Sequence, residues 1–268
     1  MHHKRIFLPD FTHGPIDIHA HINHGSMFDC PENEIHIHGL DYIENVYNGA
    51  NVTQAGISTY ASVLEHTECI PEENEYLNRL AEKKPWVYQW VVVDPRQPAT
   101  FTQAEKLLSH PKVLGIKIHP GNYGYNLLDY ADMLFAFADQ NRAVILMHPQ
   151  HISKMLLFAN QYPHMKLIIA HLGSIEHIDA IAGAMHGNIY TDTSGSASSY
   201  NNILEYAVQR VGSEKILFGT DNYSFAFQYG RIALSNISVK DKENILWKNA
   251  SRLFPEAFQT RSNVIFSL

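Results

Sequence analysis

Cysteine is scarce in this sequence, which has only Cys30 and Cys69 among its 268 residues. Two cysteines are too few for a disulfide framework, and their spacing does not match the Cys-x-x-Cys pairs of many zinc sites. We therefore expect both to be free thiols in a reducing compartment. Any metal in this protein is expected to bind nitrogen and oxygen atoms rather than sulfur.

Basic residues and long apolar runs are also few. Lys and Arg number 20 against 27 Asp and Glu, a formal charge of -7, whereas a nucleic-acid-binding protein usually presents a basic face. No stretch approaches the roughly 18 apolar residues of a membrane span, and the run Ile6–Leu8 is too short for the core of a signal peptide. We expect a cytoplasmic protein that binds a small molecule and neither nucleic acid nor membranes.

Eight short runs, most of them dense in Ile, Val and Leu, recur along the chain, as expected of parallel strands buried on both faces. They are Pro15–Ile18, Ile57–Val63, Trp86–Val93, Val113–Ile118, Ala143–Met147, Leu167–Ala170, Asn188–Tyr190 and Lys215–Phe218. Helical patterns lie between or beyond them at Gly39–Ala50, Asn126–Gln140, Ser153–Tyr162, Ser174–His186, Ser199–Val211 and Asp241–Leu253. Eight alternating units in about 250 residues predict an α/β fold, the (β/α)8 TIM barrel.

The main alternative is a doubly wound open sheet, which usually has a Gly-rich phosphate loop after its first strand. Here the first run leads into His19-Ala20-His21 instead. Because no linker-like or low-complexity segment interrupts the chain, we expect a single domain over residues 1–268, with its core at about 15–254. The segment Asn23–Ile37 is predicted to be a long first loop that helps to shape the substrate pocket.

Residues that can bind a metal come at the carboxyl ends of the predicted strands. Asp17, His19 and His21 alternate along the first run and so share one face of it, where the two histidines can reach one ion. Further candidates follow the later runs, at His119, His148, His171 and Asp221. In a barrel these strand ends converge on one mouth, where active sites are built, so the sequence predicts a metal site there.

Imidazole nitrogens with a carboxylate suit Zn(II), with Mn(II) or Fe(II) as alternatives. Three or four protein ligands leave a position for water, and a divalent metal lowers the pKa of that water to about 7. Asp221 can bind the metal and accept the water's proton. His171, where it is not a ligand, can stabilise the transition state or protonate the leaving group. These two are the predicted catalytic residues.

The same residues carry a family resemblance. The ordered set resembles the amidohydrolase superfamily, most closely its amidohydrolase-2 branch of TIM-barrel metal-dependent hydrolases, through Asp17-Ile18-His19-Ala20-His21, His148, His171 and Gly219-Thr220-Asp221. The segment Asn244–Phe254 resembles the C-terminal helix of that branch, and the match runs from about Pro15 to Phe254. The resemblance implies metal ligands at His19, His21 and Asp221.

The resemblance leaves the number of metal ions open. In members with one metal the fifth-strand histidine, here His148, is a ligand and the sixth-strand histidine, here His171, is catalytic. In members with two metals both histidines bind a second ion, together with a bridging carboxylated Lys or a Glu of the fourth strand. Lys117 is placed to be that lysine or, alternatively, to hold an anionic substrate. We favour one metal.

Position alone indicates the substrate-binding residues, which are Lys117, His119, Asn222 and Tyr223, with Asp192 as a further part of the pocket. The predicted reaction is hydrolysis of an ester, lactone or amide bond of a small molecule. One alternative is non-oxidative decarboxylation of a small aromatic or unsaturated acid, a reaction of some members of the branch. Another is a non-catalytic metal-binding barrel. The sequence does not specify the substrate, and it leaves a symmetric homo-oligomer open.

Overall fold

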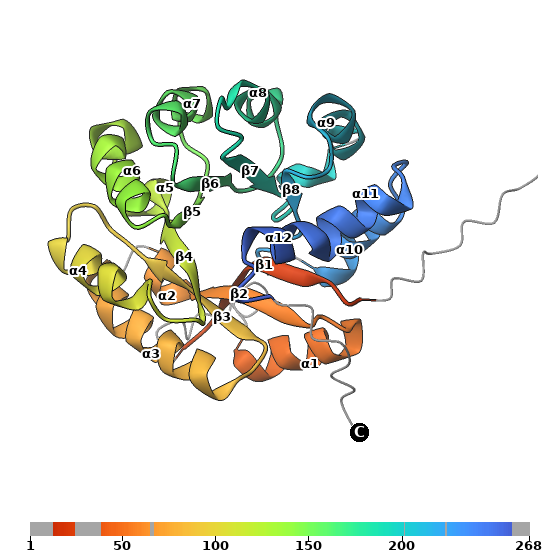
Figure 1. The fold of residues 1–268 in the computed structure, drawn as a ribbon. Coiled ribbons are helices and arrows are strands. Elements are labelled where there is room, and N and C mark those ends of the chain that lie inside the picture. Colours follow the sequence, from red (N-terminus) through yellow and green to blue (C-terminus); the bar gives the residue numbers. More distant parts are fainter. Residues whose placement is uncertain (1–12, 25–38, 65–66, 201, 223, 259–268) are drawn as a thin grey trace, which may run out of the picture.

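The computed structural model describes residues 13–24, 39–64, 67–200, 202–222 and 224–258. Eight parallel strands form one sheet in chain order, so each strand pairs with the next along the chain. Ile18 N donates to Phe218 O (3.0 Å) and Asp221 N donates to His19 O (2.7 Å), which joins the last strand to the first. Helices surround this ring of strands (Figure 1). The predicted (β/α)8 barrel is confirmed.

The strands are β1 (Ile16–Ile22), β2 (Gln54–Thr59), β3 (Val87–Val92), β4 (Val113–Ile118), β5 (Val144–Met147), β6 (Lys166–Ile169), β7 (Ile189–Asp192) and β8 (Ile216–Leu217). The α-helices are α1 (Leu40–Ala50), α2 (Tyr60–Val63), α3 (Ile70–Lys83), α4 (Pro98–Leu107), α5 (Pro120–Tyr123), α6 (Ala131–Gln140), α7 (Ile152–Gln161), α8 (Ile175–Gly183), α9 (Ile203–Val211), α10 (Phe225–Ala233), α11 (Val239–Glu243) and α12 (Asn249–Leu253). Within the described part of the chain, no helix has the length and apolar character that crossing a membrane requires.

The first two strands differ from their predicted bounds. β1 pairs with β2 as far as Ile22, which lies opposite Thr59, so His19 and His21 are part of the strand rather than beyond its end. The predicted continuation of the second strand to Val63 is wrong. The Thr59 side chain accepts a hydrogen bond from Ser62 N and caps α2, and this side-chain acceptor turns the chain from strand into helix.

Two predicted helices are interrupted. The prediction of one helix from Asn126 to Gln140 is wrong, because Asn126 caps a separate 3-10 turn, η3 (Leu127–Asp129), through Leu128 N, and α6 begins only at Ala131. The last predicted helix starts earlier, at Val239, and passes through a π-helical turn, η5 (Asn244–Lys248), into α12. The predicted loop Asn23–Ile37 lies mostly outside the described residues.

One end of the barrel is closed by apolar packing. Residues near the amino ends of the strands, such as Ile16, Tyr88 and Leu114, form a buried cluster with Leu253 and Phe254 at the end of α12. In Figure 1, α12 lies beside β1 accordingly. The predicted site residues lie at the opposite end of the barrel, at the carboxyl ends of the strands.

Trp90 fills the barrel interior. Its side chain is fully buried, and its Nε1 donates to Ile18 O at 2.7 Å. Two glycines on neighbouring strands make room for the indole, because a Cβ on Gly56 would lie 2.7 Å from Trp90 Nε1 and one on Gly115 would lie 3.1 Å from its Cζ3. Glycine at these positions allows the backbone to approach a large side chain closely.

We expect Gly115→Ala to lower the free energy of unfolding by about 2 kcal/mol or more, as overpacking of a filled core does. The added Cβ would lie 2.1 Å from the carbonyl oxygen of Val144, a backbone atom that cannot rotate away. Gly230→Ala is the matched control, since a Cβ there meets nothing within 4 Å on α10. Urea unfolding of both variants measures the effect, and equal stability of the two would contradict this packing argument.

Candidate metal centre

Four histidines and one aspartate meet at the carboxyl ends of the strands. β1 contributes His19 and His21, while His148 follows β5, His171 follows β6 and Asp221 follows β8. The two β1 histidines are buried, and His171 and Asp221 are partly exposed. The parallel barrel brings these distant segments together because all its strands end at the same rim.

The backbone after β6 and β8 is strained. His171, Asp221 and Asn222 have φ angles of 63°, 54° and 57°. These lie in the left-handed region, which costs an L residue about 1–2 kcal/mol. His, Asp and Asn are the residue types that most often adopt it, and such strain concentrates at functional sites. Asn222 helps to hold the turn, because its side-chain oxygen accepts from His21 N (2.6 Å) and its amide donates to His21 O.

Three donor atoms converge on one point. His21 Nε2 is 3.0 Å from Asp221 Oδ1, and His19 Nε2 is 3.4 Å from the same oxygen. The other ring nitrogen of each histidine is already bonded, His19 Nδ1 to Asp192 Oδ2 and His21 Nδ1 to Ser58 Oγ, both at 2.9 Å. Histidines held through one nitrogen present the other to a metal, and this is the usual arrangement of ligands in metal sites. The donor set therefore fits a divalent ion.

Asp17 lies beneath this centre. Its buried carboxylate accepts hydrogen bonds from Tyr47 OH and Thr220 Oγ1, both at 2.7 Å, and from the backbone N of His19 and Thr220, both at 3.1 Å. Burial raises the pKa of Asp17 to about 6, although the hydrogen bonds from Thr220 and Tyr47 oppose this. Asp17 thus ties β1 to the turn that carries Asp221.

Burial sets the charges at the centre. It lowers the pKa of His19 to about 4 and that of His148 to about 3, and it also lowers the pKa of His21, so these rings are neutral near pH 7 and keep a lone pair. Burial alone would raise the pKa of Asp221, but His19 and His21 lower it well below its ordinary value. Neutral imidazoles beside an ionised carboxylate are the protonation states that metal binding requires.

Lys117, on β4, faces the same point from inside the barrel. Its side chain is fully buried, with Nζ 2.7 Å from His19 Nε2. Burial lowers the pKa of Lys117 to about 8, and the carboxylates of Asp221 and Asp192 oppose that shift. Lys117 is therefore in direct contact with a candidate ligand, and its predicted role in binding substrate or a second metal stays a prediction.

His148 and His119 form a second group. His148 Nδ1 is 3.2 Å from His171 Nε2, and the His148 ring stacks on His119 with centroids 4.0 Å apart. Among the described residues, His148 is not in the group formed by His19, His21 and Asp221, whose ligand atoms lie within 4.8 Å of one another. Its role as a ligand of the first metal stays a prediction.

The predicted substrate-binding residues differ in their surroundings. His119 is buried and its Nδ1 accepts from Asn122 N at 3.3 Å, which caps α5. The amide of Asn222 is engaged with the β1 backbone, as described above, so its contact with substrate stays a prediction. Tyr223 lies outside the described residues. Arg96 is paired through two hydrogen bonds with Asp94, at 2.9 and 2.8 Å.

Two serines that touch the histidines were not predicted. Ser58 bonds His21 Nδ1, and Ser194 Oγ lies 3.0 Å from His19 Nδ1 and 2.8 Å from His171 Nδ1. The predicted second strand, which is longer than the observed one, included Ser58 and gave its side chain no role. Ser194 comes two residues after Asp192, in the segment that follows β7, and that spacing was its one signal in the sequence.

Residues 16–255 match the family model described as Amidohydrolase. The chain belongs to the amidohydrolase family. The resemblance drawn from the sequence is thereby confirmed, and the protein is an enzyme of the metal-dependent amidohydrolase type. A comparison with curated protein sequences gives no match.

Solved structures share the fold of this amidohydrolase. A 2,6-dihydroxybenzoate decarboxylase from Rhizobium is 13% identical, with a TM-score of 0.72 over 91% of this chain and 99% of that one. A dihydroxybenzoic acid decarboxylase from Polaromonas sp. JS666, with bound manganese and the inhibitor 2-nitroresorcinol, is 15% identical, with a TM-score of 0.68 over 96% and 100%. An amidohydrolase 2 from Bifidobacterium longum subsp. infantis is 18% identical, with a TM-score of 0.64 over 91% and 99%. Such identities show a common barrel only.

Proposed function

We propose that this amidohydrolase is a metal-dependent hydrolase that cleaves an ester, lactone or amide bond of a small molecule with water. The observation that carries the proposal is the convergence of His19 Nε2, His21 Nε2 and Asp221 Oδ1 at the mouth of the barrel. A divalent ion held there, most suitably Zn(II) with Mn(II) or Fe(II) as alternatives, would lower the pKa of a bound water to about 7 and polarise a carbonyl group.

The remaining groups have complementary roles in this proposal. Asp221 keeps its second oxygen, Oδ2, 3.9 Å from His171 Nε2, so the carboxylate can accept a proton from water and pass it to the imidazole. His171 then delivers a proton to the leaving group. Lys117 and His119, both buried beside the centre, are proposed to bind the substrate.

The number of metal ions decides the role of His171. With one ion, His171 is free for proton transfer, and this is the arrangement we propose. A second ion would instead use His148 Nδ1 and His171 Nε2, which face each other at 3.2 Å, and would need Lys117 in a carboxylated form as the bridging residue.

Decarboxylation of a small aromatic acid is the second candidate. Two observations favour it: the buried Lys117 could hold a carboxylate, and several structures with the same fold are decarboxylases. Arg96 does not add to this, because Asp94 neutralises its guanidinium. Among the described residues, Lys117 is therefore the basic side chain that contacts the candidate metal centre.

The two candidates differ in their products. We would assay the metal-loaded protein against a panel of lactones, esters and amides by proton release, and against dihydroxybenzoic acids by CO2 release. Our proposal expects hydrolysis that disappears on chelation and returns with Zn(II) or Mn(II), without CO2 release. Release of CO2 alone would establish the decarboxylase, and hydrolysis that survives complete metal removal would overturn the proposal.

A further inference from the structure

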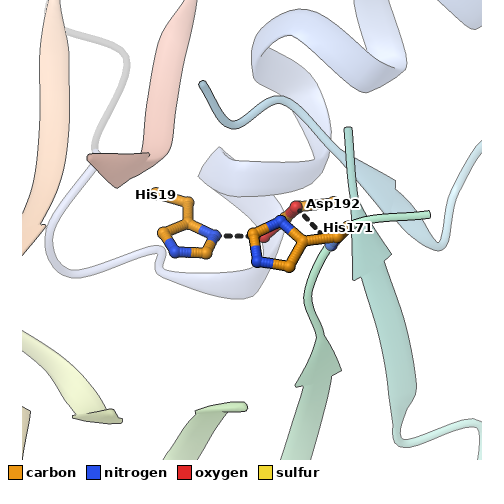
Figure 2. Close-up of side chains that lie close together, drawn as sticks. All are labelled: His19, His171 and Asp192. Carbon is orange, nitrogen blue, oxygen red and sulfur yellow. Dashed lines mark hydrogen bonds and ion pairs between the residues drawn. The ribbon is translucent and has the colours of Figure 1, made fainter. Parts of the chain in front are cut away.

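Asp192 and Ser194 connect His19 with His171. Asp192 ends β7, is fully buried, and accepts from His19 Nδ1 through Oδ2 (2.9 Å) and from His171 N through Oδ1 (3.0 Å), as Figure 2 shows. Ser194 is equally buried, and its Oγ lies between His19 Nδ1 (3.0 Å) and His171 Nδ1 (2.8 Å). The buried pair of Asp192 and Ser194 therefore contacts both histidines. It lies on the side of the His19 ring opposite Nε2, the atom that faces Asp221.

The positions of the protons in this network follow from the hydrogen-bond donors that surround Asp192. Asp192 Oδ1 accepts from the backbone N of His171 and Ser194 and also from the Ser194 hydroxyl, while Oδ2 faces His19 Nδ1. An oxygen pair surrounded by donors is an ionised carboxylate and can only accept. His19 must therefore carry its proton on Nδ1.

The contact with Ser194 determines in the same way which ring nitrogen of His171 carries the hydrogen. A hydroxyl has one proton, and that proton is donated to Asp192 Oδ1. Towards His171 Nδ1, the serine oxygen is thus an acceptor, so His171 Nδ1 carries the hydrogen. In its uncharged form the His171 ring then has its lone pair on Nε2, the nitrogen that faces His148 and Asp221.

The backbone around the pair leaves little room for another arrangement. Gly195 has φ of 67, and a Cβ there would lie 2.9 Å from His171 Nδ1. A Cβ on Gly219 would lie 2.9 Å from His19 Cβ and 3.2 Å from Ser194 Cβ. The backbone therefore packs tightly against the His171 ring and against the Cβ atoms of His19 and Ser194.

We propose that Asp192 and Ser194 are a shared positioning pair, which holds the candidate ligand His19 and the candidate proton-transfer residue His171 in the Nδ1–H form at the same time. Metal binding through His19 Nε2 and proton acceptance at His171 Nε2 are then set by one buried carboxylate. The part of this inference that concerns proton transfer rests on the proposed hydrolase function, whereas the two tautomers follow from the hydrogen bonds alone.

The tautomers can be measured directly by 15N NMR of the imidazole rings in the full-length protein with added Zn(II), with signals assigned by single His→Asn variants. We expect Nδ1–H forms for both His19 and His171 in the wild type. In Ser194→Ala, His171 should lose that preference while His19 keeps it through Asp192. Finding the Nε2–H form of neutral His171 in the wild type would overturn the proposal.

Metal affinity gives a second readout. We expect Asp192→Asn to weaken Zn(II) binding by about 10–100-fold, as loss of a partner that orients a ligand does. Ser235→Ala is the control, since Ser235 is a buried serine just beyond the end of α10 whose hydroxyl donates to Ile232 O. Unchanged Zn(II) affinity in a folded Asp192→Asn protein would refute the coupling to His19.

The outcomes separate this inference from the proposed function. If the wild type shows both Nδ1–H rings but hydrolyses none of the panel, the hydrolase proposal fails and the positioning pair stands. If hydrolysis is found but the His171 ring carries its proton on Nε2, the positioning pair fails and the hydrolase proposal stands.

Discussion

Asp221→Asn is expected to lower kcat/KM of this amidohydrolase by about 10³-fold, within the range for loss of a general base, and to weaken metal binding as well. The amide removes the charge that balances the ion, and its NH2 group cannot coordinate. Asn also keeps the backbone intact, because Asp221 has φ of 54 and Asn tolerates that conformation, whereas Ala would add strain. Steady-state kinetics and metal titration measure the two effects.

The matched control for this variant is Asp179→Asn. Asp179 is an exposed aspartate on α8, so the same change of charge occurs away from the centre. We expect the control to keep wild-type kinetics and metal affinity. If a folded Asp221→Asn protein bound metal and turned over substrate like the control, Asp221 would be neither ligand nor base.

His171→Asn is the second change with a large expected effect. Removing a group that transfers a proton in the transition state lowers kcat by about 10²–10⁴-fold. Asn is again the suitable replacement, because His171 has φ of 63. Under the one-metal proposal the variant keeps its full metal content, since His19, His21 and Asp221 are unchanged.

Metal analysis of the same variant separates the two arrangements. A loss of metal in His171→Asn, with a corresponding loss in His148→Asn, would mean that both histidines bind a second ion, as their 3.2 Å contact allows. Wild-type kcat in His171→Asn would contradict any role for this residue in proton transfer. Leu157→Ala, an exposed change on α7, serves as the control.

The barrel could be predicted from the sequence because its signal is repeated. Apolar runs of strand length alternate with helical patterns, and each unit supports the assignment of the next. The ends of the elements were less predictable. β2 ends at Thr59, whose hydroxyl accepts from Ser62 N, and such a local capping interaction leaves no periodic pattern to detect.

The candidate ligands could be predicted for a similar reason. His19, His21 and Asp221 each come at or near the end of a strand, and the parallel barrel places all strand ends at one rim. The hydrogen-bond partners of His19 could not be predicted, because Asp192 and Ser194 lie 173 and 175 residues from it along the chain. Such contacts depend on the closed ring of strands and on side-chain rotamers, which one sequence does not specify.

Metal content is the measurement that tests the central claim most directly. The full chain would be purified without an affinity tag or chelator and analysed by mass spectrometry for Zn, Mn and Fe, beside a His19→Ala/His21→Ala double variant. The account predicts about one equivalent of a divalent metal in the wild type, as three protein ligands can hold, and its loss in the double variant. A folded wild-type protein that contains no metal, and gains none when Zn(II) or Mn(II) is added, would contradict it.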